Sequence, residues 1–475
     1  MATQLRSVFH PEVTGYGEVN KDALRLLTKP GKGYLALLGF SIALVLLAVA
    51  AFLTMVTFGL GVTGLTNPVN WATFITTFVF WVGIGHAGTL ISAILYLFRA
   101  PWRQAIYRAA EAMTVFAVIT AALFPLIHIG RPWFFYWLLP LPSERHIWPN
   151  FRSPLLWDVF AVTTYLTIST VFFYIGLIPD IAGARDGTTV AWRKKAYSIL
   201  ALGWRGTDRE WKNFTRAYLY LAALATPLVL SVHSVVSWDF AVSIVPGWHT
   251  TIFAPYFVGG AILSGIAMVV TILVPIRKVF HLEKYFTPLH FDRMAKLLIL
   301  TSLVVGYAYL MEYFMAYYSG DLFERGVFWD RVTGQYWWAG WSMITFNAIM
   351  PQLLWFPKIR RNLNAFFLIS IFVNIGMWYE RFVIIVPPLA HSYEPWKWLN
   401  YHMGPVEAAI LLGSFGWFFM WFLLFLRFLP GISMAEIKEV LPPPISEHEA
   451  EHEADDERER LVEELPTGYK EYERR

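Results

Sequence analysis

The chain of 475 residues contains no cysteine, and only 15% of its residues are charged, whereas 56% are hydrophobic. The absence of cysteine excludes disulfides, thiolate-ligated iron–sulfur clusters and a CxxCH haem attachment within the chain. A soluble fold could not cover so much apolar side chain with so little polar surface. The composition predicts an integral membrane protein that, if it handles electrons, takes them from a diffusible carrier or a partner.

Apolar runs long enough to cross a bilayer as helices, which takes roughly 20 residues, recur along most of the chain. We predict an all-α integral membrane protein with about ten transmembrane helices. They lie near residues 34–60, 71–98, 105–127, 154–178, 214–243, 250–274, 294–318, 336–356, 363–387 and 404–429.

A faint internal repeat relates the second span to the sixth and the third to the seventh. "WVGIGHAGTLISAILYLFRAP" resembles "YFVGGAILSGIAMVVTILVPI", and both are rich in small residues that permit close helix approach. We therefore expect two four-helix bundles followed by two further helices. The predicted parts are a surface segment (1–33), a first bundle (34–178), a loop (179–213), a second bundle (214–358), two additional helices (359–429) and a charged tail (430–475).

Basic residues cluster on alternate connections between the spans, which predicts orientation because Lys and Arg favour the cytoplasmic side. Both termini and the loop at 179–213 are therefore expected in the cytoplasm, and the loops that open with His128, Gly320 and Pro388 are expected outside. The clusters include Arg25, Lys29, Lys32, Arg99, Arg103, Arg108, Arg193, Lys194, Lys195, Arg205, Arg277, Lys278, Lys358, Arg360 and Arg361.

Ionisable side chains inside the predicted spans need an explanation, because each costs roughly 2.5–3.5 kcal/mol at the centre of a membrane helix. Most of them fall in the predicted outer half of the bilayer. We expect His86 to be a packed, hydrogen-bonded histidine, since the histidines show no repeated pair spacing typical of haem ligation. The set is His86, His128, Asp158, His233, Asp239, Glu312, Glu380 and Arg381.

The stretch "FPLIHIGRPWFF" (124–135) ends the third span with His128, and "SPLLWDVF" opens the fourth with Asp158. Consecutive antiparallel helices would bring this imidazole and this carboxylate to one depth, where they could exchange protons near neutral pH. Arg131, Trp133 and Trp157 would add charge and flat apolar surface, which suits a quinol ring. Alternatively, the histidine and the arginine simply reach the interface beside an aromatic belt.

A second set of buried groups, on the later spans, could form a chain of proton-exchanging side chains. Since Glu380 and Arg381 are adjacent, they are not expected to point the same way, so at least one should find a partner on another span. The alternative is a structural ion-pair network. This predicted proton pathway contains His233, Asp239, Glu312, Glu380 and Arg381.

At "HIGRPW" and the following "SPLLWD", the sequence resembles the NrfD-like (polysulfide reductase membrane subunit) family. The extra helices, the polar N-terminus and "SVHSVVSWDF" make it similar to the larger NrfD-like subunits of the alternative complex III. The resemblance implies a subunit without haem or iron–sulfur cluster that oxidises menaquinol near the outer face. It implies His128 and Asp158 as the quinol-binding, proton-accepting and hence catalytic residues. It also implies a role in proton conduction for the later set, His233, Asp239, Glu312, Glu380 and Arg381.

The resemblance also implies partners: an extracytoplasmic iron–sulfur protein, a second NrfD-like subunit, other respiratory subunits including cytochrome c, and membrane lipid. We expect a multi-pass protein of the bacterial cytoplasmic membrane whose quinol oxidation is coupled to proton translocation, with neither a metal site nor nucleic-acid binding. Two other functions remain open from the sequence. They are a proton-coupled secondary transporter, kept open by Pro227 and Pro351, and a purely structural membrane anchor.

Overall fold

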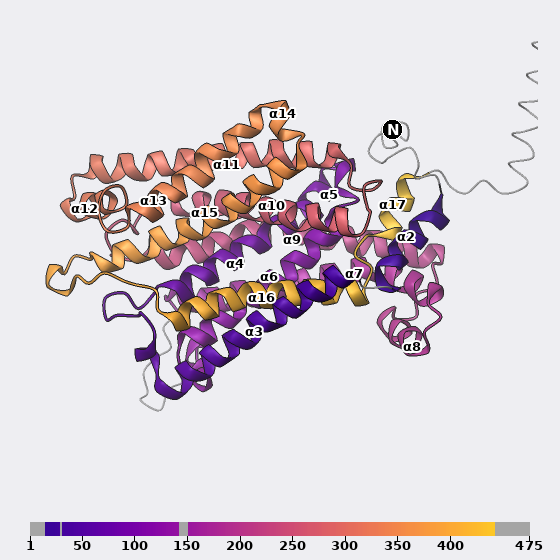
Figure 1. The fold of residues 1–475 in the computed structure, drawn as a ribbon, viewed down its shortest axis with the longest axis horizontal. Coiled ribbons are helices and arrows are strands. Elements are labelled where there is room, and N and C mark those ends of the chain that lie inside the picture. Colours follow the sequence, from indigo (N-terminus) through magenta and orange to yellow (C-terminus); the bar gives the residue numbers. More distant parts are fainter. Residues whose placement is uncertain (1–14, 29–30, 142–150, 442–475) are drawn as a thin grey trace, which may run out of the picture.

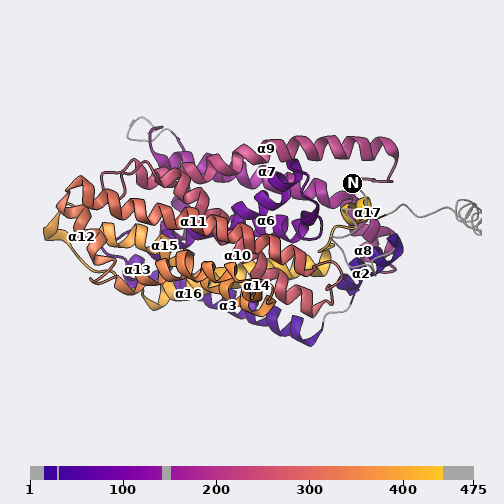
Figure 2. The ribbon, with the colours of Figure 1, turned by 90° about the horizontal axis from the view of Figure 1, so that it is seen from above.

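In a computed structural model, the structure describes residues 15–28, 31–141 and 151–441, and this part of the chain is mostly helical without a strand. Its long helices lie side by side along one axis (Figures 1 and 2). Within the described residues, nine helices are long and apolar enough to cross a membrane, which confirms the predicted fold class. They are α3 (Lys32–Phe58), α4 (Thr73–Thr89, extended by a π-helical η2, Leu90–Ile94, and by α5, Leu95–Leu97), α6 (Tyr107–His128), α7 (Pro154–Gly187), α9 (Asp208–Ala241), α10 (Phe253–Val279), α11 (Pro288–Ser319), α15 (Leu363–Ala390) and α16 (Pro405–Phe428).

The remaining predicted span, 336–356, is helical but changes its pitch twice. It consists of α13 (Trp337–Ile344), a π-helical segment η5 (Thr345–Ile349) and a 3-10 segment η6 (Met350–Trp355). Pro351 lies at the start of the 3-10 segment, where its missing N–H and fixed φ break the α-helical pattern. Inserted π turns are often found at functional sites, and this one places Asn347 in the protein interior.

Short helices cover the two ends of the bundle. One end, here called the α17 end, carries α2 (Tyr16–Thr28), η3 (Pro101–Arg103), α8 (Ala191–Leu200), α14 (Pro357–Arg360) and α17 (Met434–Val440). The other, here called the His128 end, carries η1 (Leu60–Val62), η4 (Pro132–Leu138), α12 (Leu322–Asp330) and η7 (Pro395–Lys397). In Figure 1 α2 and α17 lie together at the right and α12 lies at the left.

Two predicted polar segments are partly built into the fold. The loop predicted at 179–213 is largely helical, because α7 continues to Gly187 and α8 follows. The start of the predicted tail forms α17, which contacts α2, and α2 buries Val19, Ala23 and Leu27. The acidic stretch with His448 and His452 lies outside the described residues.

The first and last long helices, α3 and α16, form the most extensive helix pair (Figure 1). Glycine permits this approach: a Cβ atom on Gly413 would lie 2.0 Å from Cβ of Ala48, and one on Gly416 would lie 2.6 Å from Cβ of Leu44. Small residues are the usual means of close helix packing in membranes. The predicted grouping of α3 into a first four-helix bundle stays a prediction beside this contact.

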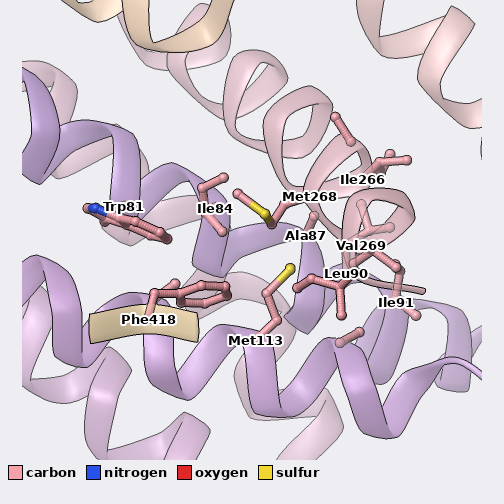
Figure 3. Packing of buried hydrophobic residues seen from close by; sticks show 14 of the residues in the cluster. Trp81, Ile84, Ala87, Leu90, Ile91, Met113, Ile266, Met268, Val269 and Phe418 are labelled. Carbon is pink, nitrogen blue, oxygen red and sulfur yellow. The ribbon is translucent and has the colours of Figure 1, made fainter. Parts of the chain in front are cut away.

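The centre of the molecule is α4, which packs between α6 and α10 (Figure 3). Its buried Trp81, Ile84 and Leu90 lie among side chains of the neighbouring helices. A Cβ on Gly88 would lie 2.0 Å from Oγ1 of Thr114, and one on Gly265 would lie 2.2 Å from Cβ of Ala87. The predicted role of these two glycines in close helix approach is confirmed.

Candidate functional site

Two Trp-Asp dipeptides meet at the His128 end, where α7 begins and α9 finishes. The carboxyl groups of Asp158 and Asp239 lie within reach of each other, and within the described residues Oδ1 of each is buried without a hydrogen-bond partner. The rings of Trp157 and Trp238 make an edge-to-face contact with centroids 6.1 Å apart. Two carboxyl groups can share a hydrogen bond only when one of them carries a proton. With one proton on the pair, it would combine a proton donor and an acceptor beside flat aromatic surface.

This pairing changes the predicted grouping of the acidic residues. Asp239 was expected with the second set of buried groups, but its partner is Asp158, because α7 and α9 lie side by side (Figure 2). The sequence contained a signal for this pair, since "LLWDVF" and "SVVSWDF" place the same dipeptide at the same end of two antiparallel spans.

His128 is the last residue of α6 and lies at the same end as Asp158. Within the described residues, its Nδ1 atom is buried without a hydrogen-bond partner, and neither a hydrogen bond nor an ion pair joins it to Asp158. The predicted helix end is confirmed: Gly130 adopts a φ of +72°, and Pro132 starts the following 3-10 turn. The hydrogen-bonding capacity of this nitrogen is not used by the described residues.

Arg131 and Trp133, which were expected beside the ring, lie on the surface. Trp133 is 55% exposed, and Arg131 is exposed at the start of η4. The segment η4 continues with further exposed aromatic residues, including Phe135 and Trp137. The structure therefore places these two residues on an aromatic outer surface rather than around the carboxyl pair.

His86 and His233 form a second pair, in the middle of the molecule. Their ring centroids are 4.5 Å apart, and Nδ1 of His86 is 2.7 Å from the carbonyl oxygen of Val82. Nε2 of His86 and both ring nitrogens of His233 are buried without hydrogen-bond partners in the described part of the chain. The expected packed, hydrogen-bonded state of His86 is confirmed, but its contact with His233 was not predicted.

The residues Glu380 and Arg381 form the core of a buried polar network. Contrary to expectation, they contact each other, with Nη1 of Arg381 2.9 Å from Oε1 of Glu380. Each also meets another span, as expected: Tyr309 of α11 donates a hydrogen bond to Glu380, and the guanidinium of Arg381 lies 4.3 Å from the ring centre of Phe257 on α10. The flexible arginine side chain can fold back, so adjacency in sequence did not prevent the ion pair.

The network extends to both sides of this ion pair. Asn347, in the π turn, donates to the hydroxyl of Tyr309 over 2.8 Å. Phe257 also packs against His233, with ring centroids 5.8 Å apart. Glu312 lies further along α11, with Oε1 3.9 Å from Nη1 of the buried Arg331. Apart from Asp239, the predicted proton-pathway residues thus lie in one buried region.

A third polar cluster, near the α17 end, was not predicted as a site. Arg108 is fully buried and donates to Asp180 (2.8 Å), Glu111 (3.1 Å) and the carbonyl oxygen of Gly176 (2.6 Å). Tyr218 donates to the other oxygen of Glu111 over 2.8 Å. Arg108 was counted as a basic residue at a cytoplasmic edge. It is the second residue of α6, but its side chain is buried in the protein instead of exposed. The Arg108–Glu111 spacing of three residues was the signal available in the sequence.

Comparison with known proteins adds the family. Residues 61–391 match the model of the family described as polysulphide reductase, NrfD. The chain belongs to this family. The match covers α4 to α15 and confirms the resemblance inferred from "HIGRPW", while α3 and α16 lie outside it.

Three relatives of this NrfD-family protein are informative. A putative dimethyl sulfoxide reductase membrane subunit of Halobacterium salinarum is 26% identical over 361 residues, 74% of this chain and 75% of the relative. A selenate reductase subunit of Mesobacillus selenatarsenatis is 23% identical, covering 69% of this chain and 76% of its own. The Hdr-like menaquinol oxidoreductase integral membrane subunit of Archaeoglobus fulgidus is 21% identical over 73% of this chain and 79% of the relative. This NrfD-family member is therefore a multi-pass membrane protein related to membrane subunits of oxidoreductase complexes.

Proposed function

We propose that this chain is the quinol-binding membrane subunit of a respiratory oxidoreductase complex. It oxidises menaquinol at the His128 end and passes the electrons to an iron–sulfur protein bound there. The observation that carries the proposal is the pair of neighbouring carboxyl groups Asp158 and Asp239, flanked by Trp157 and Trp238, at the end of the bundle where His128 has an unpartnered ring nitrogen. The name of the Archaeoglobus relative, a menaquinol oxidoreductase subunit, supports the substrate class.

Oxidation of a quinol to a quinone releases two electrons and two protons, so the site needs proton acceptors. The pair Asp158–Asp239 holds one proton between two carboxyl groups, so it can accept a second one from a ring hydroxyl. Nδ1 of His128, which has no partner among the described residues, can take up the proton of the other hydroxyl. The electrons leave to the partner, because a chain without cysteine cannot ligate a cluster through thiolates.

The orientation predicted from the basic residues puts the His128 end outside the cell. Protons taken from the quinol are then released outward, and the acceptor is an extracytoplasmic iron–sulfur protein. A second NrfD-like subunit and a cytochrome c belong to the same proposed assembly, which resembles the alternative complex III. The membrane would be the bacterial cytoplasmic membrane.

The buried network of the later helices is proposed to carry protons. Asp239 and His233 are six residues apart on α9, which is about 9 Å along a helix, so α9 connects the carboxyl pair with His233. The ring of Phe257 lies between His233 and Arg381, next to Glu380, and cannot itself carry a proton, so transfer between His233 and Glu380 requires water molecules that bridge them. Ionisable groups buried in membrane helices are by default candidates for proton relays.

The test is quinol-dependent reduction of the acceptor in the purified complex. We expect Asp158→Asn and Asp239→Asn to lower turnover roughly 10²–10⁴-fold, the usual contribution of a general base, because an amide keeps a hydrogen bond but accepts no proton. Asp186→Asn is the matched control, since Asp186 lies at the other end of α7 with a side chain that is 66% exposed.

Complex assembly is measured in parallel for all three variants. Full turnover in both site variants would contradict the proposal and leave an anchoring role. Solute uptake by the isolated chain in proteoliposomes would instead favour the secondary transporter.

A further inference from the structure

A pocket of about 510 Å³ lies at the His128 end, apart from the carboxyl pair. Its walls come from α12, from the turn after α12 and from the segment between α15 and α16. Apolar side chains, among them Phe323, Trp329 and Trp398, form most of the wall. None of the lining residues belongs to α6, α7 or α9, so this pocket is a separate feature of the molecule.

Two ionisable side chains line the pocket, and they are paired. Nδ1 of His391 lies 3.2 Å from Oδ2 of Asp330, and the other oxygen of Asp330 accepts the backbone N–H of Gln335 over 2.6 Å. Oδ2 of Asp330 has no hydrogen-bond partner in the described part of the chain, so the two side chains form an ion pair, and Nε2 of His391 is the ring nitrogen left for a ligand. The imidazole, which also packs 5.0 Å from the ring of Trp398, is thus oriented in the pocket wall.

The turn after α12 is built around this carboxylate. A Cβ on Gly334 would lie 2.0 Å from Oδ1 of Asp330, so only glycine lets the backbone close over it. Arg331, which follows Asp330 in the chain, is the buried ion-pair partner of Glu312. The pocket therefore lies against the outer end of the buried network.

The lining selects a class of ligand. The volume falls in the usual range for small-molecule sites, roughly 300–1,000 Å³, and the tryptophans offer flat surfaces for a ring. His391 and Asp330 together supply one hydrogen-bonding position without net charge, so the pocket suits an uncharged molecule. Leu322 and Trp329 line the pocket and are 78% and 59% exposed, as expected where a protein meets the lipid interface.

We propose that this pocket binds the ring of a second quinone-class molecule, with a ring oxygen hydrogen-bonded to His391. The choice of a quinone over other flat apolar rings rests on the proposed function. The existence of the pocket and of the His391–Asp330 pair is independent of it. The second ring would lie beside Arg331 and Glu312, while the first lies at the carboxyl pair.

The test is photolabelling of the purified complex in nanodiscs with an azido-naphthoquinone that carries a short prenyl tail. Labelled peptides are mapped by mass spectrometry to two regions. The pocket region comprises residues 322–334 and 391–398, and the region of the carboxyl pair comprises residues 124–158. In the unaltered complex we expect both regions to be labelled. In His391→Phe, and in the milder His391→Gln, label at the pocket should fall roughly tenfold, as for loss of a ligand hydrogen bond, and label at 124–158 should stay.

His249→Phe is the matched control, because His249 forms a similar pair with Glu324 (3.1 Å) at the same end without lining the pocket. Label confined to 124–158, or pocket label unchanged in both His391 variants, would overturn this inference and leave the proposed function standing. Label confined to the pocket would overturn the quinol site at Asp158 instead. Absence of label from both regions would overturn both.

Discussion

The cluster around Arg108 offers a sharp test of the packing at the α17 end. Replacing Arg108 by methionine keeps an apolar stem but leaves Glu111 and Asp180 buried without their cation. Breaking a buried ion pair from one side costs about 3–5 kcal/mol, and the orphaned carbonyl of Gly176 adds about 1–3 kcal/mol. We therefore expect Arg108→Met to destabilise the protein by roughly 4–8 kcal/mol.

The assay is thermal unfolding of the chain in nanodiscs, followed by the fluorescence of its 22 tryptophans, since thiol-reactive dyes have no cysteine to label. Adding Glu111→Gln and Asp180→Asn to the variant should recover more than half of the loss, because the buried charges are then gone. Lys397→Ala is the control. This change breaks the ion pair with Glu394, which has the same three-residue spacing as Arg108 and Glu111 but two side chains that are about half exposed. It should lower the free energy of unfolding by less than about 1 kcal/mol.

The reasoning fails if Arg108→Met is as stable as Lys397→Ala, or if the triple variant is less stable than the single one. The first result would mean that the cluster contributes little to stability. The second would mean that hydrogen bonding of Glu111 and Asp180, rather than their charge, dominates.

Two further changes test the packing at the ends of the chain and the loop contacts. Gly413→Val should detach α3 from α16, because its Cβ would lie 2.0 Å from Cβ of Ala48. Gly39→Val is the control and should be tolerated, because open space surrounds Gly39. Size-exclusion chromatography tests this: a peak broadened or shifted only in Gly413→Val is expected, and identical profiles of the two variants would contradict it. Glu407→Ala should cost about 2–6 kcal/mol, because the backbone N–H groups of Gly64 and Gly404 lose their acceptor; equal melting temperatures for Glu407→Ala and the wild type would contradict it. Burial, together with Glu407, raises the pKa of Tyr401, so its hydroxyl remains a donor at neutral pH.

The sequence was sufficient for the spans and for the helix end at Gly130. Long hydrophobic runs directly predict membrane-spanning helices, and a glycine followed by a proline two residues later predicts a helix end. The changes of helical pitch at 345–355 could not be predicted from the sequence, because a π turn depends on how Asn347 and neighbouring side chains pack. The closeness of α3 and α16 joins residues that are hundreds of positions apart and has no local signal.

The site was predicted only in part, for a physical reason. Depth in the membrane can be counted along each span, so Asp158 and His128 could be assigned to one end. The rotation of a helix about its axis and the choice of its neighbour depend on tertiary packing, and these decide that Asp239 meets Asp158. The same limit hid the Arg108 cluster, whose carboxylates lie on a different turn and on a different helix.

The central claim is that the carboxyl pair Asp158–Asp239 takes up a proton from the quinol. The most direct measurement is infrared difference spectroscopy of the lipid-embedded complex when quinol oxidation is triggered, with the signal of protonated carboxylic acids as readout. We predict a carboxyl signal in the wild type and in Asp186→Asn that is lost in both Asp158→Asn and Asp239→Asn. An unchanged carboxyl signal in both of these variants would contradict the account.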